Sequence, residues 1–213
     1  AIVNLLQLAQ GEKIAAVIPV KDYNEDLYVL MATRNGLIKK TKLEEYSNIR
    51  KTGIQGITLK EDDELIDVRL TNGNTSIVMV TAKGLSIRFD EEEVRAVGRT
   101  SMGVKGINLG KEDKVIGMEP IENEKDYILA ITENGFGKRT EVEEYREQAR
   151  AGKGVLTYKT TAKTGHIIGI KIVNNDDDVM LITDTGVIIR LNVKDISILG
   201  RNTQGVTLMR TSD

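Results

Sequence analysis

The stretch TDTGVIIRLNVKDISILGRNTQGV, residues 183–206, contains the pattern that decides the fold. An apolar run ends at Gly186, and a second apolar run follows with a basic residue, Arg190, four places past that glycine. Arg201 stands fifteen places past the same glycine, and Gly205 then opens the next apolar run. Short apolar runs on both sides of a glycine are typical of a β-hairpin with a tight turn.

The same pattern occurs four times along the chain. Its anchor glycines are separated by 48, 51 and 51 residues, and they are Gly36, Gly84, Gly135 and Gly186. A period near 50 residues is in the range of propellers and other repeat arrays. The basic residue four places past the glycine is Lys40, Arg88, Arg139 or Arg190. The later arginine is Arg50, Arg99, Arg150 or Arg201.

The repeats predict the domain organisation. We expect one repeat domain over residues 1–213, with a half repeat at 1–26, repeats at 27–76, 77–127 and 128–178, and a last partial repeat at 179–213. Residues 1–26 match the back half of a repeat, with an apolar strand, a polar turn and a second apolar strand. We expect four strands in a full repeat, and in the first these are Tyr28 to Thr33, Leu37 to Leu43, Gly56 to Leu59 and Leu65 to Leu70.

The predicted fold class is all-β. Four to four and a half repeats of four short antiparallel strands fit a propeller-like array of blades. The segments that follow the second strand, such as LEEYSNIRK, are expected to be irregular connections with a single helical turn, because the other copies carry glycine near the end of this segment.

Composition limits the compartment and the chemistry. The chain has no cysteine, one histidine (His166), 4% aromatic residues and a formal net charge of −2. It has no apolar run of 18 residues and no signal-peptide pattern, which predicts a cytoplasmic protein without a membrane partner. No cofactor or metal is expected, since the acidic run at Asp176 to Asp178 lacks the spacing of a calcium loop.

Tyrosine is a candidate nucleophile because its hydroxyl can attack a phosphodiester. Tyr46 and Tyr145 both stand ten places past an anchor glycine, but Val94 and Ile196 occupy that place in the other copies. A position shared by tyrosine, valine and isoleucine indicates packing, so no catalytic residue is predicted.

The recurring basic residues are the candidate binding site. Position four past the glycine has the opposite parity to the apolar positions, so its side chain leaves the other face of the sheet. Lys39 and Lys138 break the alternation and are expected at a solvated blade edge. Basic residues at a fixed height on successive blades would form a curved stripe that neutralises phosphates without reading bases. The predicted stripe contains Lys40, Arg50, Lys51, Arg88, Arg99, Lys105, Lys138, Arg139, Arg150, Lys153, Arg190 and Arg201.

Several motifs resemble a known bacterial family. IVNLLQL, ENGFGKRT, VRAVG and above all ISILGRNTQGV are similar to the C-terminal domain of the DNA gyrase A protein, part of a type IIA topoisomerase. The resemblance implies a six-bladed β-pinwheel that exchanges strands between blades, and a basic rim that wraps double-stranded DNA to assist supercoiling. It also implies that the rest of the gyrase A protein and the gyrase B protein are partners, with the cleaving tyrosine and the ATPase outside this chain.

The chain departs from that family in one motif. The family carries a Q-R-R-G-G-x-G box in its first blade, and the nearest match here is QARAGKG at residues 148–154. Four anchored repeats in place of six blades suggest that the first two blades are missing. The alternatives are a propeller scaffold that binds protein and the C-terminal domain of a topoisomerase IV subunit.

Overall fold

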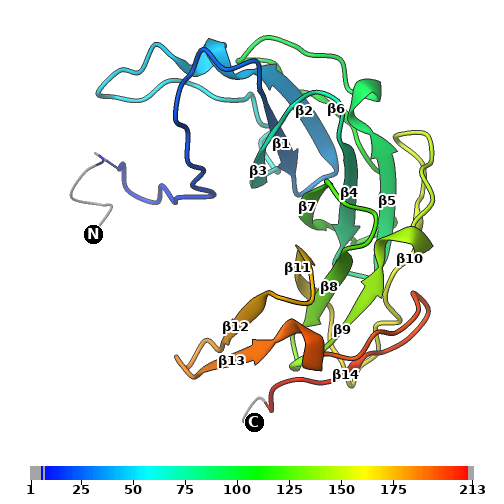
Figure 1. The fold of residues 1–213 in the computed structure, drawn as a ribbon. Coiled ribbons are helices and arrows are strands. Elements are labelled where there is room, and N and C mark those ends of the chain that lie inside the picture. The colour runs from blue at the N-terminus through cyan, green and yellow to red at the C-terminus, as the bar shows by residue number, and fades with distance from the viewer. Residues whose placement is uncertain (1–5, 7, 211–213) are drawn as a thin grey trace.

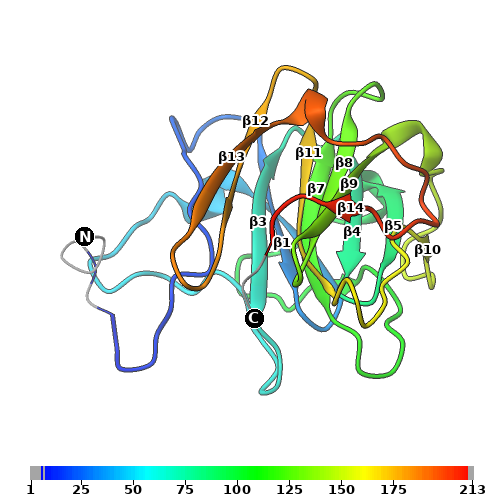
Figure 2. The same ribbon diagram turned by 90° about the horizontal axis from the view of Figure 1, so that it is seen from below.

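The protein is all-β apart from single 3-10 turns, and its sheets follow one another along an arc (Figure 1). A computed structural model describes residue 6 and residues 8–210. Three sheets have four strands and the last has two. In the turned view the strands stand roughly upright beside one another (Figure 2). The predicted propeller-like array of four-stranded blades is therefore confirmed.

The blades are defined by their strand order from the inside of the arc outward. The first blade is β3-β1-β2-β6, the second β7-β4-β5-β10, the third β11-β8-β9-β14, and the fourth is the hairpin β12-β13. The strands are β1 Tyr28–Thr33, β2 Leu37–Lys42, β3 Leu65–Thr71, β4 Ser76–Thr81, β5 Leu85–Asp90, β6 Val104–Lys105, β7 Val115–Ile121, β8 Tyr127–Thr132, β9 Phe136–Glu141, β10 Val155–Leu156, β11 Ile167–Val173, β12 Asp178–Ile182, β13 Ile188–Asn192 and β14 Val206–Thr207. The 3-10 turns are η2 Leu43–Tyr46, η3 Glu91–Glu93, η4 Val142–Glu144 and η5 Val193–Asp195.

The outermost strand of each complete blade comes from the following repeat. β10, for example, pairs with β5 through Val155 opposite Ser86, although 69 residues separate them. Gly154 directly precedes this strand with φ 75°, and a Cβ there would stand 2.2 Å from the Ser86 carbonyl oxygen. Only glycine permits both the positive φ and so close an approach. This is the strand exchange of a β-pinwheel.

Two predicted strand regions are not strands. Gly56 to Leu59 has no ladder partner, and residues 8–26 contain no strand. In the order seen in the other blades, each of these segments would pair with a strand of a further hairpin before β1. The described residues contain no such hairpin. Ile18, Val20 and Ile57 instead pack on the face of the first blade. The remainder of the strand expected near the start of the half repeat lies outside the described residues.

The core lies between blades. Ile77 and Met79 of β4 pack towards the first blade, whereas Val78 and Val80 pack towards the third. All four are fully buried, because the central strands are covered on both faces. Burial of an aliphatic side chain of this size contributes about 1.5–3 kcal/mol. Alternate residues of one strand therefore join successive blades to each other.

Candidate nucleic-acid interface

Four loops follow the 3-10 turns at equivalent places in the repeat, and we call them the rim loops. They are residues 47–53, 95–103, 146–154 and 197–205, and the last three lead into β6, β10 and β14. β10 and its loop lie on the convex side of the arc, away from the open hollow (Figure 1). Each of the last three rim loops thus connects a 3-10 turn to the outermost strand of a blade.

The tenth position past each anchor glycine packs inward beside its rim loop. Tyr145 is 2% exposed, Val94 1% and Ile196 2%, and Tyr46 is half-buried. The Tyr145 hydroxyl is hydrogen-bonded to Thr157, and burial raises the pKa of this tyrosine. The predicted packing role of this position is confirmed.

The predicted exposure of the fourth position past the glycine was wrong for Lys40, Arg88 and Arg139. Arg88 is only 5% exposed and lies between blades. It donates hydrogen bonds from Nε to the Ser76 hydroxyl (2.8 Å) and from Nη1 to the carbonyls of Tyr145 (3.0 Å) and Val142 (3.4 Å). The sheet face that alternation assigned to solvent is covered by the next repeat. Arg88 therefore holds two blades together and cannot reach a phosphate.

Lys40 and Arg139 are buried in the same way. The Lys40 ammonium donates to the Glu91 carbonyl at 2.9 Å, and Arg139 Nε donates to the Ile196 carbonyl at 2.7 Å. Arg190 occupies the same register in the last hairpin but is exposed, and it forms an ion pair with Asp178. No following repeat covers Arg190 among the described residues, which explains the difference.

Lys39 and Lys138 are also buried, which contradicts the expected solvated edge. Both side chains are 1% exposed. The Lys138 ammonium donates to the carbonyls of Gly200 (2.7 Å) and Arg201 (2.8 Å), and Lys39 contacts the carbonyls of Gly56 and Arg99. Burial lowers the pKa of each lysine to about 8. These lysines hold the backbone of a rim loop from beneath and are not part of its outer surface.

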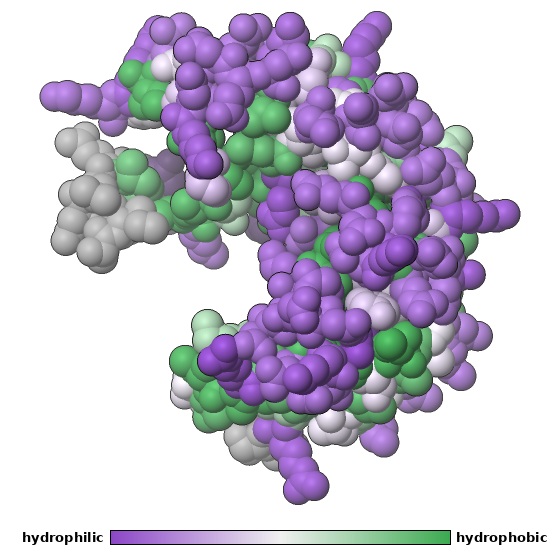
Figure 3. Space-filling view, in the orientation of Figure 1, coloured by the Kyte–Doolittle hydropathy of each residue, from purple (hydrophilic) through white to green (hydrophobic). Residues whose placement is uncertain are grey.

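The remaining predicted basic residues lie on the rim loops or in β6. Four are exposed and three are half-buried: the exposed ones are Arg50, Lys51, Lys105 and Lys153, and the half-buried ones are Arg99, Arg150 and Arg201. Sequence reasoning missed Arg95 and Arg146, which are exposed at equivalent positions of two rim loops. Their signal was weak because the other two copies carry Ser47 and Ser197 there. The outer side of the arc is mainly hydrophilic (Figure 3).

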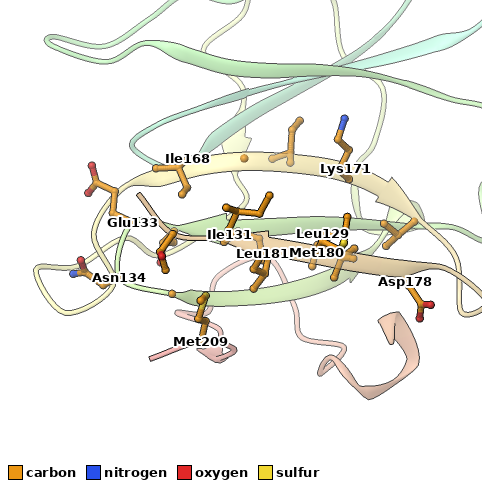
Figure 4. A pocket seen from close by; sticks show the side chains of 18 of the residues that line it. Leu129, Ile131, Glu133, Asn134, Ile168, Lys171, Asp178, Met180, Leu181 and Met209 are labelled. Carbon is orange, nitrogen blue, oxygen red and sulfur yellow. The ribbon is translucent and has the colours of Figure 1, made fainter. Parts of the chain in front are cut away.

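A second surface feature is an apolar cavity of about 980 Å³ between the third blade and the last hairpin. Ile131, Ile168 and Met180 line it, while Glu133 and Asp178 stand near its two ends (Figure 4). Among the described residues, β12 has no inner neighbour like β3, β7 and β11 of the other hairpins, and its apolar side chains Met180 and Ile182 are exposed.

Metal-binding clusters and membrane-spanning helices are both absent from the described part of the chain. Residue 6 and residues 8–210 contain no group of three histidine, cysteine, aspartate or glutamate residues that could hold a metal ion. Within the same residues, no helix has the length and apolar character needed to cross a bilayer.

Comparison with known proteins identifies the family. Residues 27–72, 75–122, 126–174 and 177–213 match the family described as DNA gyrase C-terminal domain, beta-propeller. The DNA gyrase A protein of Clostridium acetobutylicum is 51% identical over 211 residues, which are 99% of this chain and 25% of that protein. The chain therefore spans about a quarter of the length of the curated relatives it matches.

Two solved structures share the fold. The C-terminal domain of DNA topoisomerase IV superposes with a TM-score of 0.92 at 33% identity, covering 98% of this chain and 65% of that one. A DNA gyrase A C-terminal domain gives 0.91 at 24% identity, covering 100% and 71%. Matching repeats, strand exchange and sequence relatives lead to one conclusion: the chain belongs to the DNA gyrase C-terminal domain family of β-propellers.

Proposed function

We propose that this chain binds double-stranded DNA through its rim loops, without sequence specificity, and bends the DNA around the convex side of the arc. The observation that carries the proposal is the recurrence of exposed basic residues on successive rim loops. Other basic residues of the same repeat are buried between blades, so the exposed ones are those that remain available to a ligand.

Phosphate is the ligand chemistry that suits this surface. Lysine and arginine at intervals along an arc neutralise successive phosphates and release counterions, and this needs no contact with base edges. We assign the direct contacts to Arg50, Lys51, Lys105 and Lys153. Arg190 is left out because its guanidinium is paired with Asp178 and lies on a hairpin outside the rim loops.

The place of the chain in a larger enzyme follows from its relatives. The matched relatives are DNA gyrase A proteins, so we propose that residues 1–213 form a repeat domain of such a protein, with the half repeat and repeat bounds given above. The domain would assist supercoiling in the cytoplasm together with the rest of the gyrase A protein and with the gyrase B protein. Strand cleavage and ATP hydrolysis are assigned to parts outside this chain.

A salt titration of DNA affinity tests the proposal. Four to six phosphate contacts predict a slope of roughly −4 to −5 in log K against log salt, measured by fluorescence anisotropy on a labelled duplex. The double variant Lys105→Ala with Lys153→Ala should make the slope less steep by about 1.8, equally for duplexes of different sequence. The matched control is Lys60→Ala with Lys111→Ala, which removes two exposed lysines from the turns before β3 and β7.

The control variant should keep the slope of the unsubstituted chain. Equal losses in both double variants would show that only net charge matters and would contradict the rim loops as the site. A slope near zero would reject DNA wrapping and favour the alternative of a propeller scaffold that binds protein.

A further inference from the structure

We propose that Glu93 and Arg150, with their counterparts in neighbouring repeats, are positioning residues that set the curvature of bound DNA by fixing each rim loop against the one before it. This inference rests on the proposed function. It goes beyond that function by separating residues that shape the DNA path from residues that neutralise phosphate.

A glutamate of each of the first three 3-10 turns, η2, η3 and η4, binds the backbone of the next rim loop. Glu93 Oε2 accepts the Arg150 N–H at 2.8 Å. The equivalent bonds are Arg99 N–H to Glu45 Oε2 at 2.8 Å and Arg201 N–H to Glu144 Oε2 at 3.2 Å. A backbone N–H bound to a carboxylate is a charge-assisted hydrogen bond, which is stronger than one between neutral groups. Three repeats therefore use the same contact.

The arginine that carries this N–H reaches back with its side chain. Arg150 Nη1 donates to the Lys105 carbonyl in the preceding outermost strand, and Arg201 Nη1 donates to the Leu156 carbonyl at 3.0 Å. Arg99 makes the same contact with the Gln55 carbonyl. One end of each arginine is thus tied to a 3-10 turn and the other to the preceding outermost segment.

These contacts connect neighbouring phosphate-binding segments. Arg150 lies three residues before Lys153 and contacts the backbone of Lys105, so it joins Lys153 of one rim loop to Lys105 of β6, the strand that follows the preceding rim loop. Bent DNA needs its contacts at a fixed spacing, because the elastic cost of curvature is offset only when several contacts act together. A loosened loop would still attract phosphate but would follow a straighter duplex.

Three single variants separate position from charge. Glu93→Ala removes one negative charge and the carboxylate acceptor. Glu93→Gln removes the same charge and keeps a carbonyl acceptor. Glu92→Ala is the matched control, because Glu92 is an exposed neighbour on the same turn whose carboxylate makes no hydrogen bond or ion pair found in the described part of the chain.

Each variant of the 213-residue chain would be measured on one duplex labelled with donor and acceptor dyes at its ends. We expect Glu93→Ala to lose most of the rise in energy transfer that binding produces, with the salt slope of affinity unchanged. Glu93→Gln and Glu92→Ala should keep that rise. If Glu93→Ala does not fold, Glu144→Ala with Glu143→Ala as control repeats the comparison at the next repeat.

Equal energy transfer in Glu93→Ala and Glu92→Ala would overturn the inference while leaving the proposed function intact. A less steep salt slope in Glu93→Ala would also overturn it, because the loop would then be losing phosphate contacts. A lack of DNA binding by the unsubstituted chain would reject the proposed function, and this inference with it.

Discussion

Replacement of Arg88 by alanine should destabilise the blade interface and leave no specific defect in DNA contact. The change removes a guanidinium that is 5% exposed and bonded to the buried carbonyls of Val142 and Tyr145 and to the Ser76 hydroxyl. Each buried polar group left without a partner costs about 1–3 kcal/mol, and this applies to the Tyr145 carbonyl and the Ser76 hydroxyl, since the Val142 carbonyl still accepts the Tyr145 N–H. Loss of the ion pair with Glu124 adds little to the destabilisation, because the Glu124 side chain is 57% exposed and its carboxylate is hydrated once Arg88 is removed. The expected loss of unfolding free energy is therefore about 3–5 kcal/mol.

Urea denaturation followed by circular dichroism measures this loss, and Lys105→Ala is the matched control. Lys105 is an exposed basic residue, so its removal should change stability by no more than about 0.5 kcal/mol. The salt slope of DNA affinity should change in Lys105→Ala and stay constant in Arg88→Ala at temperatures where the variant is folded. The interface role of Arg88 is refuted if Arg88→Ala keeps its stability and loses part of the salt slope, since Arg88 would then be a phosphate ligand.

Two further predictions concern buried groups. Tyr145→Ala should lower the unfolding free energy by about 3–5 kcal/mol, measured by thermal or urea denaturation. Tyr145→Phe loses only the hydrogen bond to Thr157, so it should lower the unfolding free energy by about 1 kcal/mol and leave DNA affinity unchanged. A folded Tyr145→Phe variant without DNA affinity would contradict the packing role. Lys138 has a folded-state pKa of about 8 against an ordinary 10.5, so between these pH values the unfolded chain binds more protons and the unfolding free energy should rise with pH. Between roughly pH 7.5 and 9.5, the unfolding free energy of the unsubstituted chain should rise by about 1–2 kcal/mol relative to that of Lys138→Met. If the difference in unfolding free energy between the two proteins stays constant over this range, Lys138 is not buried as an ammonium.

The sequence predicted the repeats well because each hairpin is local. The anchor glycines and the alternating runs around them fix β1 and nearly fix β2, and the expected bounds of β3 differ by one residue from those observed. The outermost strands were not predictable from one repeat alone, because each pairs with a hairpin of the preceding repeat. Gly56 to Leu59 shows the consequence, since the same sequence pattern forms no strand when that hairpin is absent from the described chain.

The candidate site was predicted in part for the same reason. Alternation correctly sent Arg88 and Arg139 to the opposite face from the apolar residues, but alternation along one strand does not say what covers that face. The next repeat covers it, so a fourfold recurrence of basic residues indicated a packing requirement between blades. Arg95 and Arg146 show the converse, since exposed residues on a rim loop recur less strictly than residues that the fold requires.

The central claim is that the rim loops hold DNA in a curve, and energy transfer between dyes at the two ends of a short duplex tests it most directly. Bending 20–30 base pairs by 40–90° costs on the order of 1–6 kcal/mol, so a change in end-to-end distance requires several phosphate contacts in line. We expect binding to raise the transfer efficiency for duplexes of any sequence, and we expect the rise to disappear in Lys105→Ala with Lys153→Ala before binding is lost. Tight binding with no change in transfer efficiency would contradict the claim, because DNA would then attach to the rim without following it.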